Sequence, residues 1–111
     1  MSFVGCKAAD FRSVDAETFA QVIKDTTVVR LDVRTANEYT QGHIPNALLI
    51  DVTQADFMQK AEQLLPKDKT IALYCRSGRR SKKAARQLAQ HRYQVVELST
   101  GFNSWKGEVE Q

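Results

Sequence analysis

The sequence has few cysteines and few prolines, with two of each among its 111 residues. Two cysteines cannot build the disulfide framework of a small secreted domain, so we expect a reduced, cytoplasmic protein. No apolar stretch approaches the roughly 20 residues needed to cross a bilayer, and we expect no membrane association. One alternative stays open at Cys6, because residues 3–6 resemble the end of a lipoprotein leader. If such a leader has been removed, the protein would be exported or lipid-anchored at Cys6.

The chain also lacks internal repeats, linkers and low-complexity segments. Its hydrophobic fraction of 42% and charged fraction of 26% are ordinary for a globular protein, so we expect one domain over residues 1–111. Residues 1–12 are predicted to be an irregular lead-in, with a short edge strand near residues 11–13. We expect the domain to be a monomer.

Strands and helices are predicted to alternate along the chain. Asp15 is a candidate N-cap for a first helix of about 10 residues, and Thr35 caps a second helix that Gly42 ends. Arg34 and Glu38 are four residues apart and are predicted to pair. The remaining predicted strands cover residues 28–33, 47–50, 70–74 and 93–98, and the remaining helices residues 57–65, 81–90 and 102–106. This alternation predicts an α/β fold with a parallel sheet covered by helices on both faces.

Cys75 stands where the strand over residues 70–74 ends and before the helix that is predicted to begin at Ser81. Ligands of parallel sheets bind beyond the carboxyl ends of the strands, which is the expected position of Cys75. Free N–H groups and the positive helix terminus favour the thiolate, the nucleophilic form of cysteine. The alternative is a buried structural cysteine, but desolvating several guanidinium groups around an inert thiol would be costly.

The residues after Cys75 are typical of a site for a small anion. Guanidinium groups bind oxyanions bidentately, hydroxyl groups add hydrogen bonds, and a glycine lets the backbone curl around the ligand. The predicted substrate-binding residues are Arg76, Ser77, Gly78, Arg79, Arg80 and Ser81.

Two further residues, Asp32 and Arg34, follow a neighbouring strand and are predicted to support the cysteine loop through hydrogen bonds. The net charge is +3, and the basic residues are concentrated near residues 76–92. They surround one cysteine without interleaved aromatics, so we expect no nucleic-acid partner. No group of residues has the spacing of metal ligands, and we expect no metal or other cofactor.

Three ordered motifs give the chain a family resemblance. Cys75-Arg-Ser-Gly-Arg-Arg80 resembles the active-site loop of the rhodanese (thiosulfate sulfurtransferase) family. Residues 31–47, which contain Leu31-Asp-Val-Arg34 and Gly42-His-Ile-Pro-Asn-Ala47, are similar to the family's N-terminal signature. Gly101-Phe-Asn-Ser-Trp105 is similar to its C-terminal signature. Two departures concern turns: Asn46 replaces a common glycine, and Thr100 replaces the first glycine of a usual pair.

The resemblance implies a single-domain rhodanese with a five-stranded parallel sheet. It also implies ping-pong chemistry, in which the Cys75 thiolate takes the sulfane sulfur of thiosulfate or a similar small anionic donor and becomes a persulfide. The persulfide would then pass its sulfur to cyanide, a thiol or a protein acceptor. Loop N–H groups and Ser81 would stabilise the persulfide.

Two alternatives remain open. Phosphatases and arsenate reductases of the same fold carry Cys-x5-Arg, a loop one residue longer, whereas here the sixth residue after Cys75 is Ser81. The shorter loop favours a single sulfur atom over a tetrahedral anion. The second alternative is a non-catalytic protein. An interaction module of this family would be expected to have its cysteine replaced, and Cys75 is present, whereas a sulfur carrier acting within a larger pathway stays open.

Overall fold

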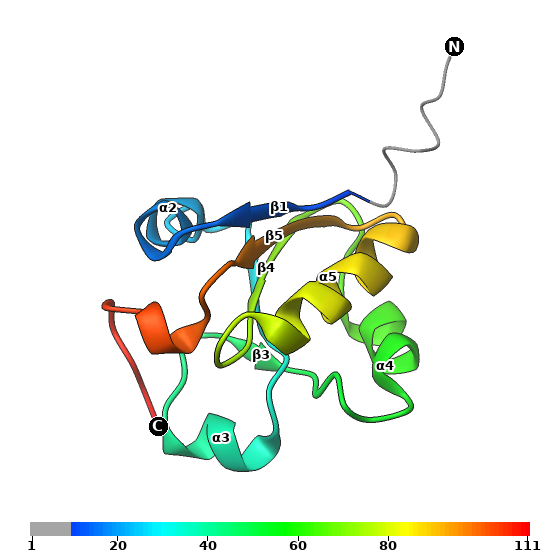
Figure 1. Ribbon diagram of the computed structural model, residues 1–111. Coiled ribbons are helices and arrows are strands. Elements are labelled where there is room, and N and C mark those ends of the chain that lie inside the picture. The colour runs from blue at the N-terminus through cyan, green and yellow to red at the C-terminus, as the bar shows by residue number, and fades with distance from the viewer. Residues whose placement is uncertain (1–9) are drawn as a thin grey trace.

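The computed structural model describes residues 10–111 and places a five-stranded parallel sheet at the centre of the protein (Figure 1). The strand order is β1-β5-β4-β2-β3, with all pairs parallel. The predicted fold class is therefore confirmed. The strands are β1 (Arg12–Val14), β2 (Val29–Asp32), β3 (Leu48–Leu49), β4 (Thr70–Tyr74) and β5 (Gln94–Leu98).

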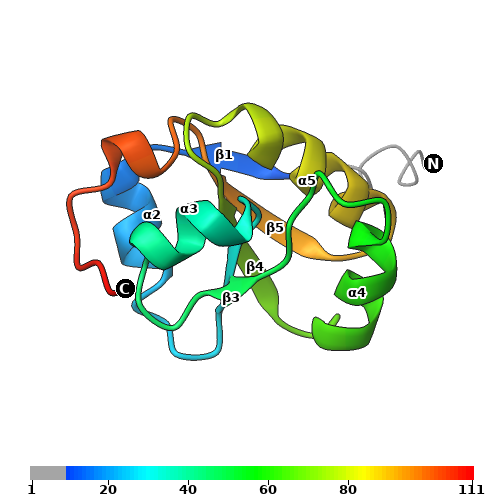
Figure 2. The same ribbon diagram turned by 90° about the horizontal axis from the view of Figure 1, so that it is seen from below.

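Helices cover both faces of this sheet (Figures 1 and 2). One face carries α2 (Ala16–Val22) and the short 3₁₀ helix η1 (Phe102–Ser104), and the other carries α4 (Phe57–Leu64) and α5 (Arg79–Gln90). The remaining helix, α3 (Ala36–Gln41), lies at the end of the sheet where the strands finish.

The central strand β4 separates two apolar layers. Its residues alternate, so Ile71, Leu73 and the following Cys75 face the α4 and α5 layer, while Ala72 and Tyr74 face the α2 layer. All five of these side chains are fully buried. The carboxyl end of β4 is therefore fixed from both sides before the chain enters the cysteine loop.

Polar caps set the ends of the shorter helices as predicted. Thr18 N donates to Asp15 Oδ1 over 2.8 Å at the start of α2, and Thr35 and Glu38 form a capping box at the start of α3. Helix α2 has 7 residues rather than about 10. It stops early because the Asp25 carboxylate accepts hydrogen bonds from the backbone and hydroxyl of Thr27, which favours a turn.

Two other predicted boundaries were wrong. Helix α5 begins at Arg79 rather than Ser81, because Gly78 adopts φ +101° and turns the chain into the helix early. The terminal helix is a 3₁₀ turn over Phe102–Ser104 and does not extend to residue 106.

The predicted edge strand is present as β1, which pairs with β5 from Arg12 onwards. The rest of the predicted lead-in, with Cys6, lies outside the described residues. Within residues 10–111, none of the helices is long and apolar enough to cross a membrane.

Candidate active site

The cysteine loop joins the carboxyl end of β4 to the start of α5. Its backbone is held by η1, because Phe102 N donates to the Cys75 carbonyl over 2.8 Å and Asn103 N donates to the Arg76 carbonyl over 3.0 Å. Residues 101–105, which resemble the family's C-terminal signature, thus hold the cysteine loop through backbone hydrogen bonds. The two segments depend on each other for their conformation.

Two glycines permit this close approach. Gly78 and Gly101 both have positive φ angles, +101° and +72°. A Cβ atom at Gly78 would collide with the Ser99 carbonyl, and one at Gly101 with the Arg76 carbonyl. The loop is therefore packed backbone against backbone, which only residues without a side chain allow.

Cys75 Sγ lies at the centre of the curled loop. It accepts hydrogen bonds from Gly78 N and Ser81 N, each over 3.2 Å. Burial raises the pKa of the Cys75 thiol, but hydrogen bonds from Ser81, Gly78 and Ser77 outweigh burial, and the pKa lies below its ordinary value. The lowered pKa thus has its cause in the hydrogen bonds that Ser81 gives through its side chain and backbone, together with the backbone N–H groups of Gly78 and Ser77.

The hydroxyl of Ser81 has another partner besides the thiol. Its Oγ donates to Glu97 Oε2 over 2.5 Å, and one hydroxyl proton cannot serve two acceptors at once. We therefore attribute the stabilisation of the thiolate to the backbone N–H groups. Glu97 is fully buried in β5 and also accepts from Ser13 Oγ at 2.6 Å and Lys82 Nζ at 3.2 Å.

Arg80 forms a two-bond ion pair with Glu38, with N–O distances of 2.8 and 2.9 Å. The hydrogen bond from Arg80 lowers the pKa of Glu38 from 4.5 to about 2. The predicted pairing of Glu38 with Arg34 was wrong, since Glu38 reaches across to the start of α5. The guanidinium of Arg80, predicted to bind substrate, is occupied by Glu38 in this structure.

Arg34 instead pairs with Asp32, and both side chains are buried. Burial opposes the charge on Arg34, but the hydrogen bond and charge of Asp32 outweigh it and raise the Arg34 pKa. Arg34 also donates to the Gly42 carbonyl over 2.7 Å, and Tyr74 Oη donates to Asp32 over 2.8 Å. The pair thus joins the ends of β2 and β4 immediately before Cys75; its effect on the loop stays a prediction.

Three of the predicted substrate-binding residues, Arg76, Ser77 and Arg79, are exposed at the rim of the loop. A hollow of about 270 Å³ opens beside Arg76. It is lined by Arg34, Glu38, Gln41, Gly42, Arg76, Phe102 and Asn103. Cys75 itself is fully buried beneath the loop, so a group that reaches its sulfur must be small or project from its carrier.

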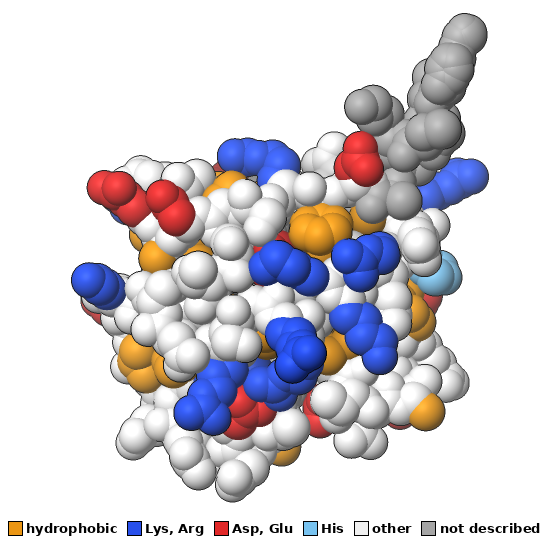
Figure 3. Space-filling view, in the orientation of Figure 1, with side chains coloured by type: hydrophobic (Ala, Val, Ile, Leu, Met, Phe, Trp, Pro, Cys, Tyr) orange, Lys and Arg blue, Asp and Glu red, His pale blue; other side chains and the backbone are white. Residues whose placement is uncertain are grey.

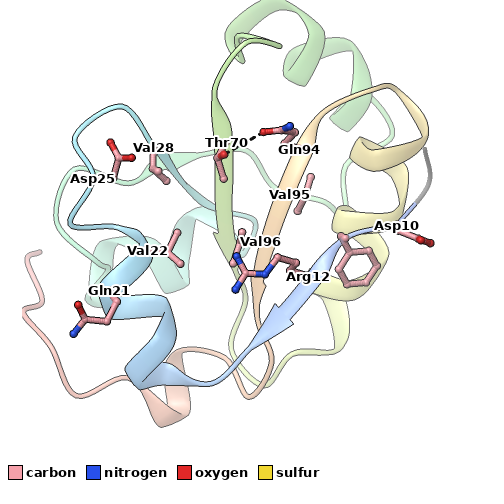
Figure 4. Close-up of a pocket in the computed structure, with 11 residues that line it drawn as sticks. Asp10, Arg12, Gln21, Val22, Asp25, Val28, Thr70, Gln94, Val95 and Val96 are labelled. Atoms are coloured by element: carbon pink, nitrogen blue, oxygen red, sulfur yellow. Dashed lines mark hydrogen bonds between the residues drawn. The ribbon is translucent and has the colours of Figure 1, made fainter. Parts of the chain in front are cut away.

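A larger hollow of about 680 Å³ lies at the opposite end of the strands (Figure 4). Arg12, Thr70 and Gln94, at the beginnings of β1, β4 and β5, help to line it. It contains neither cysteine nor histidine and is separated from Cys75 by the length of β4. Volume alone therefore does not identify the reactive site. Among residues 10–111, no cluster of three or more potential ligand side chains could hold a metal ion.

Sequence reasoning missed the roles of Glu97 and Lys82. Lys82 donates to the carbonyls of Gly78 and Ser99 as well as to Glu97, so it ties the loop to the end of β5. One feature of the sequence could have indicated the role of Glu97. Its carboxylate lies in a predicted strand beside the apolar residues Val95, Val96 and Leu98. A buried carboxylate in such a position needs donors close by.

Comparison with known proteins gives a consistent result. The family model described as the rhodanese-like domain matches residues 15–108. A sulfurtransferase of Allochromatium vinosum is 36% identical over 94 residues, which cover 83% of this chain and 85% of that protein. The thiosulfate sulfurtransferase GlpE of Coxiella burnetii is 30% identical over 87 residues, covering 78% of each chain.

A solved structure supports the same relationship. The crystal structure of a rhodanese-related protein from Thermoplasma volcanium superimposes with a TM-score of 0.78 at 29% identity. The match covers 90% of this chain and 98% of that one.

Proposed function

Because the chain belongs to the rhodanese-like domain family, we propose that it is a thiosulfate sulfurtransferase that works through a persulfide on Cys75. Sulfur transfer is supported at the level of the family, whose relatives here are named sulfurtransferases. The choice of thiosulfate or a similar small anion as donor, and of a thiol, cyanide or a protein as acceptor, is our proposal for this chain.

One observation carries the proposal. Cys75 Sγ accepts two backbone N–H groups inside a tight loop, and its pKa is lowered in spite of burial. A thiolate held in this way is a nucleophile without needing a separate base. The same N–H groups can stabilise a terminal persulfide sulfur, which also carries negative charge.

In the first half-reaction, the Cys75 thiolate attacks the outer sulfur of thiosulfate. A bond forms between Sγ and that sulfur, and the sulfur–sulfur bond of the donor breaks, with its electron pair leaving on sulfite. In the second half-reaction, an acceptor thiolate or cyanide attacks the outer sulfur of the persulfide. The Sγ–S bond then breaks, and the electron pair returns to Sγ as the thiolate.

The donor anion would be bound by the exposed cations at the rim of the loop. Arg76 and Arg79 are exposed and have no ion-pair partner within residues 10–111. Arg80 would contribute only if a donor displaced Glu38 from it. The predicted roles of Arg76 and Arg79 therefore fit the geometry better than that of Arg80.

Replacing Cys75 by serine tests the nucleophile. We expect Cys75→Ser to abolish the transfer of sulfur from thiosulfate to cyanide while the circular dichroism spectrum stays unchanged, because serine is nearly the same size. The matched control is Cys6→Ser, which removes the other cysteine and is expected to retain full turnover. The measurement is the steady-state formation of thiocyanate.

Retained turnover in Cys75→Ser would contradict the nucleophile assignment. Release of phosphate from an aryl phosphate by the wild type, lost in the same variant, would favour the phosphatase alternative. A sulfur carrier would accept one sulfur atom per chain but would not turn over with a small acceptor, so multiple turnovers distinguish an enzyme from a carrier.

A further inference from the structure

We propose that the protein accepts an acidic partner protein on a basic face formed by Arg76, Arg79, Lys83 and Arg86, and that this partner delivers a thiol to Cys75. The proposal rests on the proposed sulfur-transfer function and names the class of its acceptor. Figure 3 shows Lys and Arg side chains gathered over α5 and the loop that precedes it. Acidic side chains are sparse in the same area.

The basic face follows one side of α5. Arg79, Lys83 and Arg86 are spaced i, i+4 and i+7 and are all exposed, whereas Ala84, Ala85 and Leu88 on the other side are buried. The seven residue steps from Arg79 to Arg86 rise about 10 Å along the helix axis. Arg76 continues the row at the mouth of the cysteine loop.

The four cations are not used within the part of the chain that the structure describes. None of them has an ion pair there, and none has a side-chain hydrogen bond. Their neighbours Arg80 and Lys82, in contrast, are paired with Glu38 and Glu97. The cations that support the loop are thus neutralised by carboxylates, whereas those of the basic face remain available to bind a partner.

Stability of the helix does not explain this arrangement. The first turn of α5 contains no acidic residue, and two arginines stand there, where the helix dipole is positive. Cations at that end are unfavourable, and their mutual repulsion adds to this. Such a loss of helix stability is expected where the charged side chains are needed to bind a partner.

A small anionic donor does not explain the length of the row. In the proposed function, thiosulfate would lie beside Sγ, where the exposed Arg76 and Arg79 belong to the same loop and helix start. Arg86 lies about two turns, or about 10 Å, farther along α5 than Arg79, which is too far for a small ion beside Sγ to explain the whole row. Charges spread over about 10 Å fit a partner with several carboxylates on its surface.

The buried position of Cys75 favours a protein over a nucleic acid. A thiol on a projecting cysteine side chain can enter the loop, and acidic residues around it would meet the basic face. Single-stranded nucleic acids are bound by cations together with exposed aromatic rings on which bases stack. The large exposed hydrophobic residues in residues 10–111 are Leu64 and Val109, and neither is aromatic.

The test compares two synthetic acceptor peptides, each with one cysteine flanked by three residues on either side. The flanking residues are glutamate in one peptide and glutamine in the other. Cys75 is first converted to the persulfide with thiosulfate, and the product is checked by intact mass. We expect the glutamate peptide to remove sulfur from the persulfide at least 10-fold faster than the glutamine peptide at low salt. This difference in rate should disappear near 1 M salt.

Charge reversal on the basic face gives the decisive variant. Lys83→Glu/Arg86→Glu is expected to lose most of the preference for the glutamate peptide and to keep the wild-type rate with dithiothreitol, a small neutral thiol. The matched control is Lys24→Glu/Lys69→Glu, whose exposed lysines lie outside α5 and the cysteine loop; it should keep the preference. Equal rates for the two peptides, or an unchanged preference in the first variant, would overturn the proposal.

A binding measurement separates this proposal from the proposed function. The glutamate peptide with its cysteine replaced by serine should bind the Cys75→Ser protein, and Lys83→Glu/Arg86→Glu should weaken that binding at least 10-fold. This result requires no catalysis. If a short RNA displaces the peptide at lower concentration than the peptide's own dissociation constant, the face serves a nucleic acid, and the acidic protein partner is ruled out.

Discussion

The reactivity of Cys75 depends on a balance between burial and hydrogen bonding. The side chain is fully buried, which alone would keep the thiol protonated. Hydrogen bonds to Sγ from Ser81 and from Gly78 N outweigh burial and lower the pKa of the Cys75 thiol below its ordinary value. The arginines that surround the cysteine in the sequence are exposed or paired with a carboxylate, and we propose that the exposed ones bind the donor rather than ionise the thiol.

The ion pair between Glu38 and Arg80 predicts a specific loss of stability in acid. Arg80 lowers the pKa of Glu38 to about 2, so the pair stabilises the fold fully above pH 4.5, the ordinary pKa. This contribution is lost as the pH falls from 4.5 towards about 2. Because both side chains are partly exposed, we expect it to be on the order of 1 kcal/mol.

Glu38→Gln should remove this dependence. Urea unfolding of wild type and variant at several pH values from 2 to 7 measures it, and the difference in the free energy of unfolding should shrink as the pH falls. The control is Glu108→Gln, which changes an exposed glutamate without an ion pair within residues 10–111. A difference that stays constant over the whole pH range would contradict the pairing.

Four elements position the cysteine loop. It begins at β4, enters α5, and is held from behind by the end of β5 and by η1. Between α5 and β5, the side chains of Lys82 and Glu97 form an ion pair, so their charges neutralise each other. The conformation of the loop thus depends on close backbone contacts at its two glycines.

Gly78→Ala should disturb the loop in two ways. Its φ of +101° is strained for alanine, and the added Cβ would collide with the Ser99 carbonyl. We expect a loss of about 1 to 3 kcal/mol in the free energy of unfolding, together with slower formation of the persulfide, because Gly78 N moves away from Sγ. Chemical denaturation and the rate of thiosulfate consumption measure the two effects.

Ser77→Ala is the matched comparison for stability, since Ser77 lies in the same loop but is exposed. It should unfold at nearly the same denaturant concentration as the wild type. If Gly78→Ala were as stable as Ser77→Ala, the close contact between the loop and β5 would not be required.

The sequence predicted those features that depend on local pattern. Alternating strands and helices, the caps at Asp15 and Thr35 and the position of Cys75 all follow from periodicity and residue type over a few positions. It could not predict that Glu38 reaches Arg80, 42 positions away, because a pairing four residues away satisfied the same local rule. The contact between Ser81 and Glu97 likewise depends on which strand lies next to β4.

In the whole molecule, the Cys75 sulfur, the free cations and the largest described hollow lie in different places. The carboxyl end of the sheet holds the reactive sulfur, the outer side of α5 holds the free cations, and the hollow shown in Figure 4 lies at the other end of the strands. Two apolar layers on either side of β4 keep these regions fixed relative to one another.

The central claim is that Cys75 carries the transferred sulfur. The most direct test is the intact mass of the protein after incubation with thiosulfate, followed by peptide mapping. Our account predicts a gain of one sulfur atom located on Cys75, with one sulfite released, and a return to the original mass when a thiol is added. An unchanged mass, or a sulfur atom located on Cys6 instead, would contradict it.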